Sequence, residues 1–268
     1  MPRANGATPV EAALCDLQAG LWNWRLWTLL GWFDLLSRYR RTIAGPIWTT
    51  LAMGFFVAAL GSLYAELFAR PASVYIPHLA AGLLAWSLLS GIIVGGCRAF
   101  VASAGYIKEM RTALSVFVYR AIWHCLLVFA YQAVVLALVL LVFGIAPGPV
   151  ILLALPALLL ILVNAVWVAM IMAVAGARFP DVTEIVSSVL RLVFFLTPVI
   201  WMPDMIGART RLVELNPLYH FVELLRGPLL GYAPSPVSWL VAAGAAILGW
   251  PIAAQLYARA RPRVAYWL

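Results

Sequence analysis

Long apolar runs alternate with short segments that carry proline, glycine or charge along most of this chain. Several of the runs exceed the roughly 20 residues that a helix needs to cross a bilayer, and they recur. The pattern predicts six spans, at residues 45–68, 77–100, 116–143, 150–175, 182–202 and 237–258. Pro77 starts the second span, the turn 144–149 follows the third, and Pro203 closes the fifth. We therefore expect an all-α integral membrane protein with six transmembrane helices.

Residues 1–44 precede the spans and form a cytoplasmic lead-in and interface helix, separate from the membrane domain at 45–268. The lead-in, 1–20, is polar and expected to be mobile. Within 21–41 the polar or small residues recur every three or four positions and share a helical stripe: Arg25, Thr28, Gly31, Asp34, Arg38 and Arg41. Tryptophans and leucines cover the rest, and tryptophan prefers the headgroup layer. As a span this segment would place Arg25 and Asp34 in hydrocarbon at about 2.5–3.5 kcal/mol each, so we predict an amphipathic helix on the inner leaflet.

The segment 203–236, between spans five and six, is the longest one expected on the outer side. Asn216 and Pro217 suit the N-cap and first turn of a short helix, which Gly227-Pro228 would end. The helix is too short to span, which favours outer re-entrant helices beside a protein-lined or wet cavity. A surface helix with no role in a pathway is the alternative.

Composition agrees with a membrane protein, since 65% of residues are hydrophobic and 10% charged, against about 25% charged in a soluble domain. The net charge of +8 raises the possibility of nucleic acid, but the basic residues follow the positive-inside rule. Arg70, Arg209, Arg211 and Arg226 fall outside, Arg98 and Arg191 lie in or beside spans, and all the others fall inside. We expect both termini in the cytoplasm and no nucleic-acid partner.

Lys108 is the only lysine, and Ile107 precedes it, so the Gly-Lys pair of a P-loop is absent. If ATP drives this protein, another chain hydrolyses it. The histidines, His78, His124 and His220, lie far apart, and the three cysteines lack metal-ligand spacing. We expect no enzyme activity, no metal and no cofactor on this chain.

Two cytoplasmic segments are candidates for a mechanistic role. The loop 105–115 predicts a short helix with Tyr106, Met110 and Ala113 on one face, able to dock into a partner's groove. A solvated loop that only obeys the positive-inside rule explains it equally well. The second segment starts span five, where Asp181 and Glu184 form a capping-box pattern.

Arg191 lies about ten residues into the fifth span, too deep for easy snorkelling. With Ser187 and Ser188 it predicts a polar stripe on a translocation path; an interhelix or intersubunit contact is the alternative. Several aromatic residues are candidates for stacking on sugar rings in a pore. They are Phe55, Phe56, Tyr131, Phe194, Phe195 and Trp201.

A family resemblance follows from motifs in a fixed order after the amphipathic helix. They are Gly45-Pro-Ile-Trp48, Gly61-Ser-Leu-Tyr64, Tyr75-Ile-Pro-His78, Ile107-Lys108, Phe194-Phe-Leu-Thr-Pro-Val-Ile-Trp201, Asn216-Pro-Leu-Tyr219, Arg226-Gly-Pro-Leu-Leu-Gly231 and Arg261-Pro-Arg-Val-Ala-Tyr-Trp-Leu268. From about residue 30 to 268 the chain resembles the membrane subunit of type-2 ABC exporters for O-antigen, capsular and related polysaccharides.

The resemblance implies a homodimer in the bacterial inner membrane with two separate ATP-binding subunits, which hold ATP and Mg, and a lipid-linked polysaccharide as cargo. It implies coupling to the ATPase through Ile107, Lys108, Glu109, Met110 and Arg111. It places a cytoplasmic gate at Arg178, Asp181 and Glu184. It also makes 204–231 the outer re-entrant segment, with Asn216, Pro217, Tyr219, Glu223 and Arg226.

The chain departs from the family pattern at two places. Ala113 stands where a proline is usual after the Ile-Lys pair, and Tyr131-Gln132 stands where His-Asn is common. Two other functions compete with polysaccharide export: a type-2 ABC permease for drugs or lipids, and a non-transporting membrane scaffold or lipid-processing enzyme. The carrier lipid, the glycan and the aromatics that face the pore are left open by the sequence.

Overall fold

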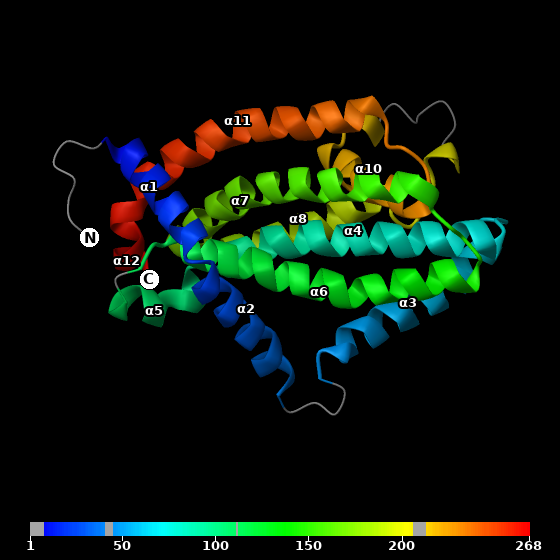
Figure 1. Cartoon of the computed structure of the whole chain (residues 1–268), viewed down its shortest axis with the longest axis horizontal. Helices are drawn as coiled ribbons and strands as arrows, with labels where there is room; N and C mark the ends of the chain where they lie inside the picture. The colour runs from blue at the N-terminus through cyan, green and yellow to red at the C-terminus, as the bar shows by residue number, and fades with distance from the viewer. Residues whose placement is uncertain (1–7, 41–44, 111, 206–212) are drawn as a thin grey trace.

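The computed structural model describes residues 8–40, 45–110, 112–205 and 213–268, and within these ranges it contains helices and no strand. The longer helices run along the long axis of the molecule (Figure 1). They are α3 (Ile47–Leu67), α4 (Ala72–Arg98), α6 (Ser115–Val142), α7 (Ala154–Arg178) and α11 (Pro236–Ala260). These helices are long and apolar enough to span a membrane. In two cases the span includes a neighbouring segment: the 3-10 turn Gly148–Leu153 before α7, and the short turns that follow α11. The helices confirm five of the six predicted spans.

The fifth predicted span is shorter than expected. Helix α8 (Val182–Leu196) has 15 residues and ends at Thr197, whose ψ of 134° is extended. Pro198 follows, and a proline disfavours the helical conformation of the residue before it. Fifteen residues reach about 22 Å, less than a hydrocarbon core of about 30 Å. The prediction that this helix continues to Pro203 was wrong, because Pro198 breaks it first.

Helix α4 lies at the centre and contacts α3, α6, α7, α8 and α10 (Pro217–Leu230). Small residues let α7 approach it closely. A side chain at Gly176 would place its Cβ 2.0 Å from the Cys97 carbonyl oxygen, and one at Gly96 would place it 2.8 Å from the Ala169 Cα. Such a seam of small residues is the usual way for membrane helices to pack, since lipid provides no hydrophobic drive between them. Pro77 lies inside α4 and does not start it, because the helix begins five residues earlier.

From Pro9 onward the predicted lead-in is helical, which corrects the expectation that it is mobile, while residues 1–7 lie outside the described residues. Helix α1 (Pro9–Trp22) begins with a reciprocal capping box between Thr8 and Glu11 and packs on α6 and α11. Helix α2 (Trp24–Tyr39) follows after Asn23 and packs on α6. On α2 the predicted polar stripe turns partly toward the protein, since Gly31 is buried. Trp24, Leu29, Trp32, Phe33 and Leu36 are exposed.

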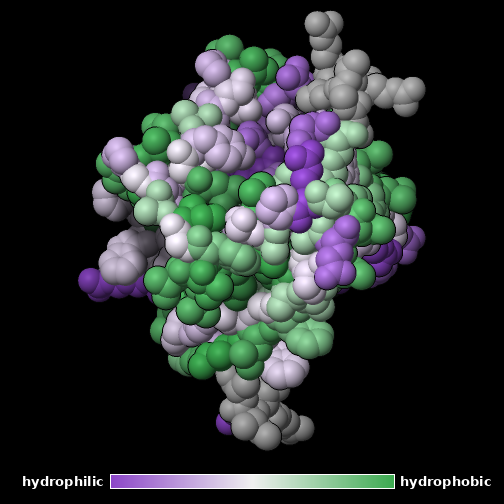
Figure 2. All heavy atoms as spheres, turned by 90° about the vertical axis from the view of Figure 1, so that its right-hand side faces the viewer, coloured by the Kyte–Doolittle hydropathy of each residue, from purple (hydrophilic) through white to green (hydrophobic). Residues whose placement is uncertain are grey.

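The start of α1 and the C-terminus lie at one end of the molecule, here called the terminal end, together with α5 (Ala104–Glu109) and α12 (Val264–Trp267) (Figure 1). The opposite, or far, end holds α10 and the connections around it. Figure 2 looks at the far end and shows hydrophilic side chains among a largely hydrophobic surface. Asn216 caps α10 by accepting from the Leu218 N–H, as predicted. The helix passes through Gly227-Pro228 and ends at Leu230, where Gly231 is the C-cap with a left-handed φ of 90°, so the prediction that Gly227-Pro228 ends this helix was wrong.

Candidate functional site

A groove of about 920 Å³ runs beside α4 and is walled by α3, α6 and α8. We call it the central groove. Its lining includes Phe56, Trp86, Ser90, Gln132, Arg191 and Phe194. Arg191 is exposed, and its Nη2 donates to the Ser188 hydroxyl one turn away at 2.8 Å. The Phe194 ring lies 5.4 Å from both Trp86 and Phe195, so the arginine stands beside an aromatic cluster.

The structure brings together five of the nine residues that the sequence suggested for a translocation path. Phe56, Ser187, Arg191, Phe194 and Phe195 all line the central groove. The remaining four do not. Tyr131 lies on α6, where its carbonyl accepts from the Thr50 hydroxyl, and Trp201 donates its indole N–H to the Phe195 carbonyl. The Ser188 hydroxyl accepts from Arg191, and Phe55 is 79% exposed.

A second hollow, the α2 cavity, lies between α2, α4 and α6 and measures about 600 Å³. It contains Arg120, which the sequence did not single out, together with Asp34 and Arg98. Arg120, in the second turn of α6, donates from Nε to Asp34 of α2 at 2.6 Å and from Nη2 to the other carboxylate oxygen. Its Nη1 lies 3.4 Å from the Ser103 hydroxyl. Arg98, in the last turn of α4, also lines the cavity.

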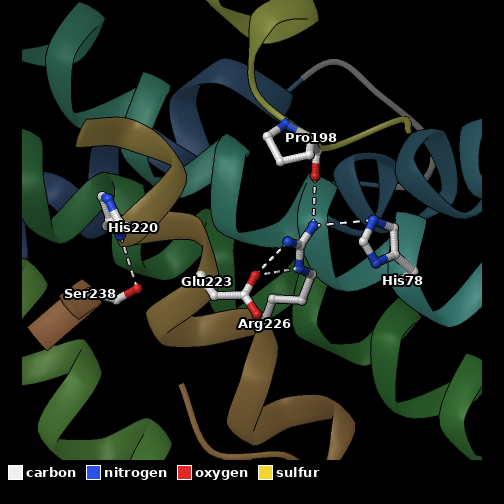
Figure 3. A network of polar contacts seen from close by, with 6 residues as sticks. All are labelled: His78, Pro198, His220, Glu223, Arg226 and Ser238. Atoms are coloured by element: carbon white, nitrogen blue, oxygen red, sulfur yellow. Dashed lines mark hydrogen bonds and ion pairs between the residues drawn. The ribbon is translucent and has the colours of Figure 1, made fainter. Parts of the chain in front are cut away.

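A buried polar cluster, the Arg226 network, joins three segments at the far end (Figure 3). Arg226 of α10 is 1% exposed, and its Nη1 donates to the Pro198 carbonyl at 2.6 Å and lies 3.1 Å from His78 Nε2 of α4. Its Nε donates to Glu223 Oε2 at 3.0 Å, and Nη2 donates to the same oxygen, so that two N–H groups of the guanidinium fork on it. The arginine thus holds the chain just after the break at the end of α8.

Other bonds hold the same break. The buried Thr197 hydroxyl accepts from Asn216 Nδ2 at 2.8 Å, and Tyr75 of α4 donates to the Ile200 carbonyl. A cavity of about 560 Å³ beside the Arg226 network is lined by Tyr219 and Tyr232 among others. Burial, reinforced by the nearby Glu223 carboxylate, raises the pKa of the Tyr232 phenol, so this group stays protonated and neutral.

The predicted coupling segment is a short, exposed helix at the terminal end. Lys108, Glu109 and Met110 point away from the protein, while Ile107 packs against the main hydrophobic core. Arg111 lies outside the described residues. The helix ends at Glu109 and Met110 is extended. The predicted common face of Tyr106, Met110 and Ala113 was therefore wrong: Ala113 is 2% exposed and belongs to the core, whereas Tyr106 and Met110 are exposed.

The three predicted gate residues lie where α7 ends and α8 begins. The Arg178 guanidinium lies over the rings of Phe179 at 5.3 Å and Trp267 at 5.6 Å, which ties the end of α7 to the C-terminal α12. Asp181 and Glu184 are exposed. Asp181 occupies the N-cap of α8 as predicted, but its side chain makes no capping bond, so the predicted capping box is not formed.

Asp16 forms a buried junction that the sequence analysis missed. Its carboxylate, 2% exposed, accepts from the Ser115 N–H at 3.1 Å, the Tyr257 hydroxyl at 2.6 Å and Arg261 Nε at 3.2 Å. The Asp16 carbonyl also accepts from the Ser115 hydroxyl at 2.7 Å. One acid thereby joins α1 to the start of α6 and the end of α11. The available signal was a charged side chain that interrupts a short apolar run, between Ala12-Ala-Leu-Cys15 and Leu17.

Five helices that are long and apolar enough to cross a membrane, packed around α4, indicate a multi-pass membrane protein. The chain matches the ABC-2 type transporter family over residues 25–230, which is most of its length, and belongs to that family. It is therefore a membrane permease subunit of the kind that works with ATP-binding subunits, and not the catalytic subunit. Comparison with individually curated proteins gives no significant match.

Proposed function

We propose that two copies of this permease form a bacterial inner-membrane exporter for lipid-linked polysaccharide, of the O-antigen or capsule type. In this proposal the terminal end faces the cytoplasm and the far end faces outward. Two separate subunits bind and hydrolyse ATP with Mg. The observation that carries the proposal is the central groove, where Arg191 lies beside the Trp86 and Phe194 rings.

The groove offers the two kinds of contact that a lipid-linked glycan needs. Aromatic faces stack on the apolar faces of sugar rings, and Trp86, Phe194 and Phe195 present such faces together. The guanidinium of Arg191 suits a phosphate, because arginine binds phosphate oxygens with two parallel hydrogen bonds. The motif order found in the sequence also favours the polysaccharide exporters.

A second copy is supported by the exposed side of α8. Ile185, Val189, Leu192 and Phe195 are each at least 51% exposed on this helix. An apolar face by itself is at home in lipid, but the exposed Arg191 lies on the same helix. A bare guanidinium at mid-membrane costs about 2.5–3.5 kcal/mol or more. A second copy that closes a wet path over the central groove would remove this cost.

Arg191 variants test the substrate and the path together. In cells that depend on this chain for surface glycan, Arg191→Ala should reduce the glycan at the surface far more than it reduces the amount of permease in the membrane. Arg191→Lys should restore export in part, since it keeps the charge but not the fork. Arg259→Ala, a change of an exposed arginine at the end of α11, is the control and should export normally.

A cysteine at position 191 tests whether the groove is wet. In a background without Cys15, Cys97 and Cys125, it should react with a water-soluble thiol reagent in at least one nucleotide state. Full protection in every state, together with normal export by Arg191→Ala, would contradict the proposal. If a deletion strain keeps its surface glycan but loses drug or lipid export, the alternative of a drug or lipid permease is favoured. If no ATPase co-purifies with the chain, the non-transporting class is favoured.

A further inference from the structure

One arginine in the lining of the α2 cavity has no acidic partner among the described residues. Arg98 lines the cavity, is exposed, and makes no hydrogen bond or ion pair with any residue in the described ranges. It ends α4, where a positive charge favours the helix C-terminus. That role does not explain why the side chain borders a cavity of about 600 Å³.

The second arginine of the cavity is held rigidly. The fork of Arg120 on Asp34 fixes α2 against α6, and Ser103 lies within reach of the same guanidinium. Asp34 neutralises Arg120, so Arg98 carries the surplus positive charge of the cavity wall. The Arg120 guanidinium also lies 5.6 Å from the ring of Tyr106 in α5. The cavity wall is therefore in direct contact with the predicted coupling helix.

The α2 cavity adjoins the central groove. Ser87, Gly91 and Val94, on one stretch of α4, line both hollows. The result is one track along α4 with Arg98 at the terminal end and Arg191 farther along.

The surface around the cavity suits a lipid. Helix α2 forms its outer wall, and Trp24, Trp32 and Phe33 on that helix are 55%, 41% and 55% exposed. Exposed tryptophans of this kind settle at the headgroup layer. A phosphate on a lipid in the same leaflet would therefore lie at the depth of α2, while its chain remained in the bilayer.

We propose that the α2 cavity is a receiving site for the phosphate of a membrane lipid, with Arg98 as the residue that binds the phosphate. Arg120, fixed by Asp34, forms the wall of the site and connects it to α5. The inference deepens the proposed export function, on which it rests for the identity of the lipid as the cargo's carrier. Arg98 is thus the first residue to bind the phosphate, on a track along α4 that leads to Arg191.

Direct binding tests the site. The full-length permease with its ATP-binding subunits, in uncharged detergent, is titrated with radiolabelled farnesyl phosphate, a short isoprenoid phosphate. Arg98→Ala should weaken binding about tenfold, equivalent to about 1.4 kcal/mol. Arg98→Lys should weaken it less, and Arg98→Gln serves as a second neutral variant if the alanine variant is poorly folded. Farnesol, which lacks the phosphate, should bind wild type and Arg98→Ala equally.

Arg259→Ala is the matched control, because Arg259 is also an exposed arginine in the last turn of a spanning helix. It should leave farnesyl phosphate binding unchanged. Competition identifies the source of the phosphate: displacement by farnesyl phosphate but not by short-chain phosphatidylglycerol assigns the site to an isoprenoid carrier. Equal displacement by both assigns it to membrane phospholipid, and either result supports a phosphate site.

Two results would overturn the site: farnesyl phosphate binding unchanged by both neutral variants of Arg98, or an equal loss in Arg259→Ala. The outcome is separate from that of the proposed function. If the complex exports glycan but its farnesyl phosphate binding does not depend on Arg98, only the proposed phosphate site is wrong. Arg98-dependent binding in a complex that exports no glycan removes the proposed substrate and leaves the site in place.

Discussion

Arg226→Ala should destabilise the permease strongly, because it breaks a buried ion pair and a bond to the broken end of α8. The change removes the fork on Glu223, the 2.6 Å bond to the Pro198 carbonyl and the contact with His78. The Glu223 carboxylate would remain nearly buried, with 11% side-chain exposure, and without its cation. Removing one partner of a buried pair typically costs about 3–5 kcal/mol, so we expect a loss of that size.

The matched control is Arg70→Ala. Arg70 pairs with Asp204, also toward the far end, but its side chain is 37% exposed and that of its partner 57%. An exposed pair contributes at most about 1 kcal/mol, since water and salt screen it. Equilibrium unfolding in mixed micelles with increasing SDS measures both losses in free energy.

A double variant separates the ion pair from the other contacts. Arg226→Met with Glu223→Met leaves no unpaired charge, and replacing a whole buried pair by apolar residues is often nearly neutral. The double variant should therefore lose less stability than Arg226→Ala alone. If Arg226→Ala costs no more than Arg70→Ala, the network does not hold the end of α8 and the reasoning fails.

Four further predictions concern other parts of the chain. Purified without partners, the chain should show no ATPase activity in a phosphate-release assay; robust hydrolysis by a contaminant-free sample would refute the division of labour. Exchanging the charges of Lys108 and Glu109 should lower export and ATPase stimulation at normal membrane levels, and unchanged coupling would make α5 a solvated helix only. Asp16→Ala should lower the free energy of unfolding by about 2 kcal/mol or more, because several buried donors lose their acceptor; limited proteolysis should then release α1 faster than in wild type, and equal cleavage rates would contradict the junction. Gly231→Ala should cost about 1–2 kcal/mol in SDS unfolding, because its left-handed φ of 90° is strained with a side chain, whereas Gly244→Ala, with no neighbour within 4 Å, should not destabilise.

Helix positions were largely determined by the sequence. Apolar runs of membrane length fix where a span lies, because backbone groups in hydrocarbon must bond within the segment. The predicted starts at 45, 116 and 237 lie within two residues of the observed helices, which begin at Ile47, Ser115 and Pro236. The helix cap at Asn216 could also be predicted from the sequence, because it depends on a local bond between a side chain and the backbone.

The sequence predicted that a proline ends α8, but not which proline. Pro198 lies inside the predicted fifth span and Pro203 directly after it, and the sequence pattern favoured the later proline as the end of the helix. Apolar content continues past Pro198, so hydropathy alone cannot choose between them. The structure chooses the earlier proline because Arg226, Asn216 and Tyr75 supply partners for the non-helical backbone and side chain at 197–200.

Only the tertiary structure decided which polar residues meet. Asp34 and Arg120 are 86 positions apart, and Asp16 and Arg261 are 245 apart, so no local pattern connects them. The sequence marked Arg191 and Phe194 by their own character, but helix packing placed them with Trp86 in one groove. Local chemistry specifies helices and caps, whereas cavities and buried ion pairs arise from surfaces that distant segments bring together.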